Sequence, residues 1–79
     1  MKLPHDLGGE QLAAHLIKHW DYIKVHQVGS HMILETQVPS AHRISVPAHK
    51  ALRIGTLNSV LASVAAHKQV SKEAILKGI

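Results

Sequence analysis

A Gly-Ser pair near the middle of the chain, Gly29-Ser30, constrains the fold more than any other feature. Apolar and polar residues alternate over residues 22–28 before it and over residues 31–37 after it. Such alternation is typical of strands with one buried face, and a Gly-X pair between two strands favours a type II′ hairpin turn in which glycine takes the positive φ. The sequence therefore predicts an antiparallel hairpin whose turn pairs Val28 with His31.

This register assigns a buried and an open face to the hairpin. The predicted core face carries the apolar side chains Ile23, Val25, Met32 and Leu34. The predicted open face carries the polar and charged side chains together with one isoleucine: Lys24, His26, His31, Ile33 and Glu35. Lys24 would stand opposite Glu35, and opposite charges on facing residues favour that register. A slip of one residue would send every side chain to the wrong face.

Apolar residues recur at the helical period on both sides of the hairpin. Leu12, Ala13, Leu16, Ile17 and Trp20 form one stripe, which predicts a helix over about residues 9–20. Leu57, Val60, Leu61 and Val64 form a second stripe, for which Thr56 is the expected N-cap. Ser71 is expected to cap a short final helix over residues 72–77.

A third strand is expected over residues 42–46, with Ile44 and Val46 inward, Arg43 outward and Pro47 ending it. The element order is then α-β-β-β-α with a small extra helix. We expect one α+β domain over residues 1–79, in which both amphipathic helices cover one face of a three-stranded antiparallel sheet and the other face stays open.

The amino-acid composition limits the classes of function that the chain can have. The 79 residues carry a net charge of +4, which suggests an anionic partner such as nucleic acid, although ordinary solubility charge explains it equally well. The absence of cysteine excludes disulfides, thiolate metal sites and cysteine nucleophiles, and it fits a cytoplasmic protein. No stretch approaches the roughly 20 apolar residues of a membrane span, and no signal peptide is visible.

The eight histidines direct attention to metal binding and to acid–base catalysis. His15 and His19 share one side of the first predicted helix and could chelate a metal, but Leu16, Ile17 and Lys18 lie between them, so two surface histidines are the simpler interpretation. Ser30 and His31 are neighbours on a strand and point in opposite directions, which disfavours a serine–histidine pair.

RNA cleavage requires neither a metal nor a cysteine, because the 2′-hydroxyl of the substrate is the nucleophile. The protein needs a proton acceptor and a proton donor, for which histidine is suited, and positive charge beside the phosphate. His31 and His26, together with Lys24 and Arg43 on the predicted open face, match these needs. The plainer interpretation, histidines on a solvated sheet, stays open at this point.

Five segments in order resemble the HicA toxin family: Met1-Lys2-Leu3-Pro4, Gly9-Glu10, Gly29-Ser30-His31, Val46-Pro47-Ala48-His49 and Gly55-Thr56-Leu57. The resemblance covers nearly the whole chain. It implies a fold similar to the double-stranded RNA-binding domain, in agreement with the element order above. One departure is the connection to the first strand, where the family usually has glycine before an aromatic residue and this chain has Asp21-Tyr22.

The resemblance implies a cytoplasmic mRNA interferase, an endoribonuclease that cleaves mRNA without a cofactor or metal and that a HicB-type antitoxin neutralises. The essential histidine of the family matches His31. His26 and His49 are candidates for a second proton carrier, and Lys24 or Arg43 for contact with the phosphate. The expected RNA-binding residues are Gly29, Ser30, Lys50 and Arg53.

Two other functions remain open. A non-catalytic double-stranded RNA-binding module would use the hairpin tip and the start of the second helix, but Gly55 to Ala66 contains no Lys or Arg. A pure interaction protein would use the exposed sheet edge or face as its docking surface.

Overall fold

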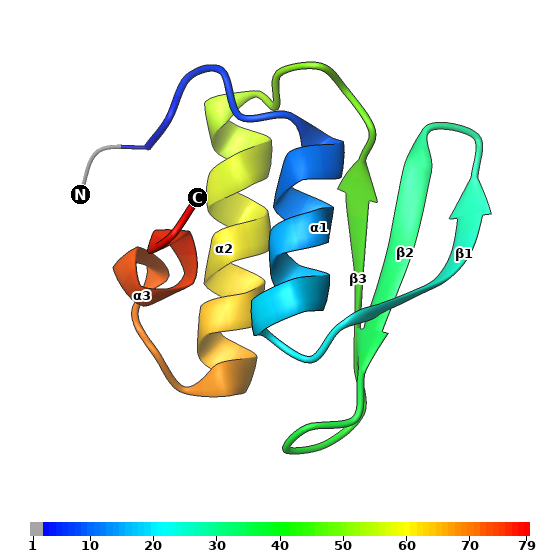
Figure 1. Ribbon diagram of the computed structural model, residues 1–79, viewed down its shortest axis with the longest axis vertical. Helices are drawn as coiled ribbons and strands as arrows, with labels where there is room; N and C mark the ends of the chain where they lie inside the picture. The colour runs from blue at the N-terminus through cyan, green and yellow to red at the C-terminus, as the bar shows by residue number, and fades with distance from the viewer. Residues whose placement is uncertain (1–2) are drawn as a thin grey trace.

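The computed structural model describes residues 3–79 and confirms the predicted α+β layout. Three antiparallel strands lie in the order β1-β2-β3, with one helix before them and two after them (Figure 1). The elements are α1 (Gly9–His19), β1 (Ile23–Val28), β2 (His31–Thr36), β3 (His42–Pro47), α2 (Ile54–Lys68) and α3 (Lys72–Leu76).

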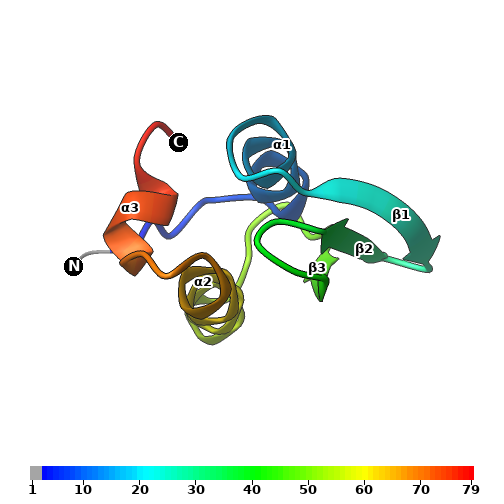
Figure 2. The same ribbon diagram turned by 90° about the horizontal axis from the view of Figure 1, so that it is seen from below.

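The core is aliphatic and lies between the helices and the inner part of the sheet. Both α1 and α2 contact β3, while β1 lies at the sheet edge farthest from the helices (Figures 1 and 2). The inward side chains of β2 and β3 are buried, as the alternation predicts. The most deeply buried aliphatic side chains come from every layer: Leu12, Leu16, Leu34, Val46, Leu57, Leu61, Val64 and Ile75.

The first turn of α1 packs directly on the end of β3. A Cβ atom on Gly9 would lie only 1.7 Å from the carbonyl oxygen of Pro47, so no larger residue fits there. The Gly9 amide donates to the carbonyl of His49 at 2.9 Å. This close approach fixes the loop that follows β3 against the start of α1.

The hairpin confirms the turn and half of the predicted register. Gly29 has a φ of +58°, and Val28 pairs with His31 as expected. A bulge between Lys24 and His26 then shifts the pairing, so that Lys24 stands opposite Leu34 and the predicted pairing of Lys24 with Glu35 is wrong. Bulges of this kind are common at sheet edges.

The prediction that Ile23 and Val25 belong to the core is also wrong. All six residues of β1 are exposed, and Ile23 retains 62% of its accessible surface. The alternation correctly indicated a strand, but burial of one face also needs a helix above it, and the helices contact β3 instead. The pattern of β1 alone therefore could not predict its burial.

The connections refine three further expectations. Asp21 has a φ of 61°, so it adopts the left-handed conformation that glycine adopts most easily, and Tyr22 after it is 1% exposed. Helix α2 begins at Ile54 with Arg53 as its N-cap, earlier than the predicted cap at Thr56. Ser71 caps α3 as predicted, because its hydroxyl accepts from the amide of Ala74 at 3.1 Å.

Candidate functional site

His31 begins β2 immediately after the hairpin turn, and its side chain is exposed as predicted. The next residue, Met32, is buried, so alternation places His31 on the opposite, open side of the sheet. In the register it stands opposite Val28 on one side and Pro47 on the other. Its Nδ1 lies 3.3 Å from the hydroxyl of Ser45, a long hydrogen bond that leaves Nε2 available to a substrate.

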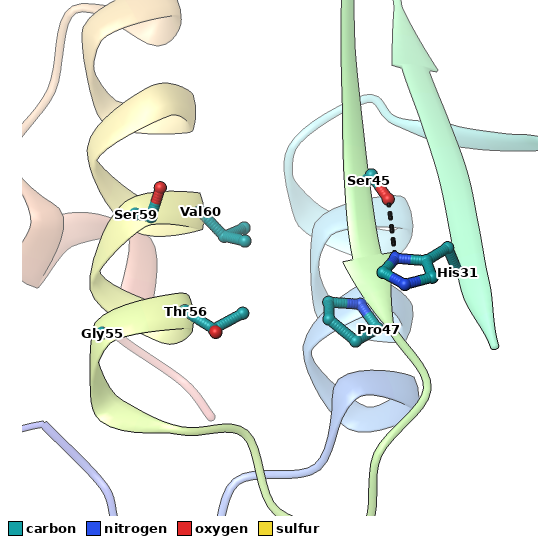
Figure 3. Close-up of a pocket in the computed structure, with 7 residues that line it drawn as sticks. All are labelled: His31, Ser45, Pro47, Gly55, Thr56, Ser59 and Val60. Atoms are coloured by element: carbon teal, nitrogen blue, oxygen red, sulfur yellow. Dashed lines mark hydrogen bonds between the residues drawn. The ribbon is translucent and has the colours of Figure 1, made fainter.

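A cavity of about 480 Å³ lies between His31 and the first half of α2. Figure 3 shows its two walls, of which one is formed by the sheet and the other by the helix. It is lined by His31, Ser45, Pro47, Gly55, Thr56, Ser59 and Val60. The cavity thus joins the exposed imidazole to three hydroxyl groups.

A second cavity of about 180 Å³ continues along β3 from the first. It shares three lining residues with the first, and its full lining is Arg43, Ile44, Ser45, Ser59, Val60 and Ser63. We refer to the two cavities together as the β3–α2 groove. None of the residues that line either cavity is acidic, so the groove suits an anionic ligand.

Of the other predicted catalytic residues on the strands, His26 and Arg43 lie on the same face as His31, and Lys24 lies on the other face. His26 is exposed and stands opposite Ile33, two positions from His31 on the same face. Arg43 lines the groove, but Glu35 accepts hydrogen bonds from its Nε at 3.1 Å and from Nη2 at 2.8 Å, which offsets its charge. The bulge removes Lys24 from the face of His31, contrary to prediction, and its ammonium donates to Gln27 at 2.5 Å.

A backbone hydrogen bond connects the two segments that carry the predicted RNA-binding residues. The carbonyl of Ser30 accepts from the amide of Ala48 at 2.6 Å, which ties the hairpin tip to the loop between β3 and α2. This loop carries His49, Lys50 and Arg53, and all three side chains are exposed. The structure therefore brings the turn and the basic loop together.

Sequence reasoning missed a hydrogen-bonded network around His42, because no local sequence motif indicates it. Nδ1 of His42 lies 2.9 Å from the Tyr22 hydroxyl, and Nε2 lies 3.2 Å from the Ser63 hydroxyl. The ring of His67 stacks on that of His42 at 4.3 Å. The only sequence signal is the spacing of Ser63 and His67, one helical turn apart on α2.

The protonation state of this network follows from burial. Burial raises the pKa of Tyr22 to about 12, so the phenol keeps its proton at neutral pH, and its oxygen lies 2.9 Å from Nδ1 of His42. Burial first, then the charges of His67 and Lys68, lower the pKa of His42 below its ordinary 6.5. Neutral His42 has one protonated and one unprotonated ring nitrogen, so it donates to one of the two hydroxyls, those of Tyr22 and Ser63, and accepts from the other. This arrangement holds the side chains of Tyr22, His42 and Ser63 in place.

The two histidines of α1 show no metal site. Their rings lie 4.9 Å apart, but His15 is buried and donates through Nε2 to the Ile75 carbonyl at 2.8 Å, so the surface assignment made for it was wrong. Within residues 3–79, no three His, Asp or Glu side chains come close enough to hold a metal ion.

Comparison of the chain with known protein families, with curated proteins and with solved structures finds no match. Among the residues that the structure describes, no helix is long and apolar enough to cross a membrane. The functional assignment consequently depends on the geometry of the site and on the sequence motifs.

Proposed function

We propose that the chain is a HicA-type toxin, a metal-independent endoribonuclease that cleaves mRNA in the cytoplasm and is neutralised by a HicB-type antitoxin. The observation that carries the proposal is the position of His31. Its imidazole is exposed, follows a tight turn, and borders a groove that hydroxyl groups line without any acidic side chain. The five motifs in order support the same assignment.

The chemistry that this site supports is an internal displacement. His31 accepts the proton of the substrate 2′-hydroxyl, whose oxygen attacks the adjacent phosphorus while the bond to the 5′-oxygen breaks. The leaving 5′-oxygen takes up a proton, and the other product ends in a 2′,3′-cyclic phosphate. Histidine as a residue type is suited to either proton transfer at neutral pH.

The second proton carrier is drawn from the histidines at the same end of the sheet. His26 shares the open face with His31, and His49 follows the end of β3 that is tied to the hairpin tip. Lys50 and Arg53 in the same loop supply the positive charge that Lys24 cannot supply from the other face. Phosphate contacts of this kind position the RNA without reading its sequence.

A non-catalytic RNA-binding module is the second candidate. The backbone hydrogen bond between the hairpin tip and the loop that carries Lys50 and Arg53 favours it, because phosphate binding by such exposed basic residues requires no proton transfer. Such a module would bind RNA without cleaving it, and removal of one imidazole would leave its affinity unchanged.

Cleavage of RNA by the purified protein in excess chelator separates these functions. We expect cleavage that persists in chelator, yields 2′,3′-cyclic phosphate ends, and is lost in His31→Ala. The matched control is His19→Ala, which removes an exposed imidazole from α1 and should cleave like wild type. A requirement for metal, or full activity of His31→Ala, would contradict the proposal.

A further inference from the structure

The β3–α2 groove extends well beyond the catalytic histidine. It begins beside His31 and Pro47 and ends at Arg43 and Ser63, four residues back along β3. Four residues of strand span about 13 Å. Successive nucleotides of one stacked strand are separated by about 3.4 Å, so the groove has room for more than one nucleotide.

The lining of the groove combines hydroxyl donors with an apolar floor. Ser45 projects from the sheet, and Thr56, Ser59 and Ser63 project from α2. The Ser63 hydroxyl also lies 3.2 Å from Nε2 of His42, which helps to fix its position in the groove. Hydroxyl groups donate to phosphate and sugar oxygens.

The apolar part of the lining comes from three residues. Val60 and Pro47 are buried, and Ile44 is 7% exposed. Such surfaces pack against sugars and base faces. The combination is suited to a polynucleotide chain better than to a free phosphate ion.

The shape of the groove favours an unpaired strand. Proteins read duplex RNA across its surface by shape, with elements that contact phosphates and 2′-hydroxyls, whereas single strands lie in grooves between protein walls. Here a strand and a helix form two walls, and Val60 points from the helix toward the strand (Figure 3). A paired strand would be held away from that floor by its complement.

We infer that the β3–α2 groove binds a single-stranded RNA segment that runs from the phosphate at His31 toward Arg43. This inference rests on the proposed endoribonuclease function, because that function places the reacting phosphate at His31. It specifies unpaired RNA as the substrate, and it assigns Thr56, Ser59 and Ser63 as contacts along the strand.

The test uses the cleavage-deficient His31→Ala protein as its background. The probes are a short unstructured RNA oligonucleotide and the same oligonucleotide annealed to its complement, with affinity measured by fluorescence anisotropy. Ser59→Glu places a negative charge in the groove, and Ala66→Glu makes the same change of charge on an exposed position of α2 outside it. Both variants are checked by circular dichroism, and Thr56→Glu replaces Ser59→Glu if the latter fails to fold.

We expect tighter binding of the single strand than of the duplex, and a loss of about tenfold, equivalent to 1.4 kcal/mol, in Ser59→Glu but not in Ala66→Glu. Preference for the duplex, or equal effects of the two glutamates, would overturn the inference. If wild type still cleaves RNA in that case, only the groove assignment fails. If wild type cleaves nothing while the Ser59-dependent binding persists, the groove stands as a binding site and the endoribonuclease fails.

Discussion

Two histidines on the same sheet, His31 and His42, lie in opposite environments. His31 is exposed and makes one long hydrogen bond to Ser45. His42 is half-buried, has hydrogen-bond partners at both ring nitrogens, and stacks on His67. The same side chain therefore has one long hydrogen bond at the start of β2 and is held by several partners at the start of β3.

The difference has a topological cause. His31 follows the hairpin turn and is paired only with residues of neighbouring strands. His42 begins β3, the strand that both α1 and α2 contact, so the α1–β1 connection and α2 both contribute partners to it. The hydrogen-bond partners that Tyr22 and Ser63 provide, and not residue type, separate the environment of His42 from that of His31.

The largest expected effect is the loss of cleavage in His31→Ala. Removal of a positioned acid–base group typically lowers the rate by about 10² to 10⁴-fold. Because His31 is exposed, the free energy of unfolding should stay within about 0.5 kcal/mol of wild type. Single-turnover cleavage measures the rate, and urea denaturation measures the free energy of unfolding. A large loss of stability in His31→Ala would show that His31, like His42, has a structural role.

His42→Ala should have the reverse effect. It removes two hydrogen bonds and leaves the buried Tyr22 hydroxyl without its partner, which costs about 1–3 kcal/mol of folding free energy. Cleavage by the folded protein should remain close to wild type. An unchanged urea midpoint would show that the network contributes nothing to stability.

The pH dependence of the free energy of unfolding tests the structural role of His42 in another way. The groups that face His42 are Tyr22, Ser63, His67 and Lys68, and the folded pKa of His42 lies below its ordinary 6.5. As the pH falls, His42 is therefore protonated at a higher pH in the unfolded chain than in the folded protein.

The free energy of unfolding should accordingly decrease as the pH falls below 6.5 and continue to decrease until the folded pKa has been passed. Urea denaturation at a series of pH values measures this slope. His42→Gln, which cannot be protonated, should flatten it over the same range, and an identical slope in both proteins would refute the role of His42.

The smallest expected effect belongs to Ser45→Ala. Loss of its long contact with His31 should cost about 0.5 kcal/mol, roughly a twofold decrease in cleavage rate. Since Ser45 contacts the ring at Nδ1, the expected loss reflects a less well positioned imidazole, and single-turnover cleavage measures it. An unchanged rate would show that this contact does not position His31.

The local sequence pattern was sufficient to predict most of the fold. The Gly29-Ser30 turn, the pairing of Val28 with His31, and the exposure of His31 follow from turn chemistry and alternation, which are properties of adjacent residues. The bulge at Val25 was not predictable in this way, because a two-residue period allows no extra residue. Its consequence, the removal of Lys24 from the candidate site, could therefore be seen only in the fold.

The order of elements, the aliphatic core and the histidine at the turn all follow from the amino-acid sequence. Helical periods, strand periods and turn residues are patterns within a few neighbouring positions, so they can be recognised without the fold. The tertiary structure alone decided which surfaces meet. It placed Ser59 and Ser63 of α2 beside Ser45 and joined Tyr22, His42 and His67, all of which are distant in the chain. Such contacts depend on where α2 packs along β3, and no local period encodes that position.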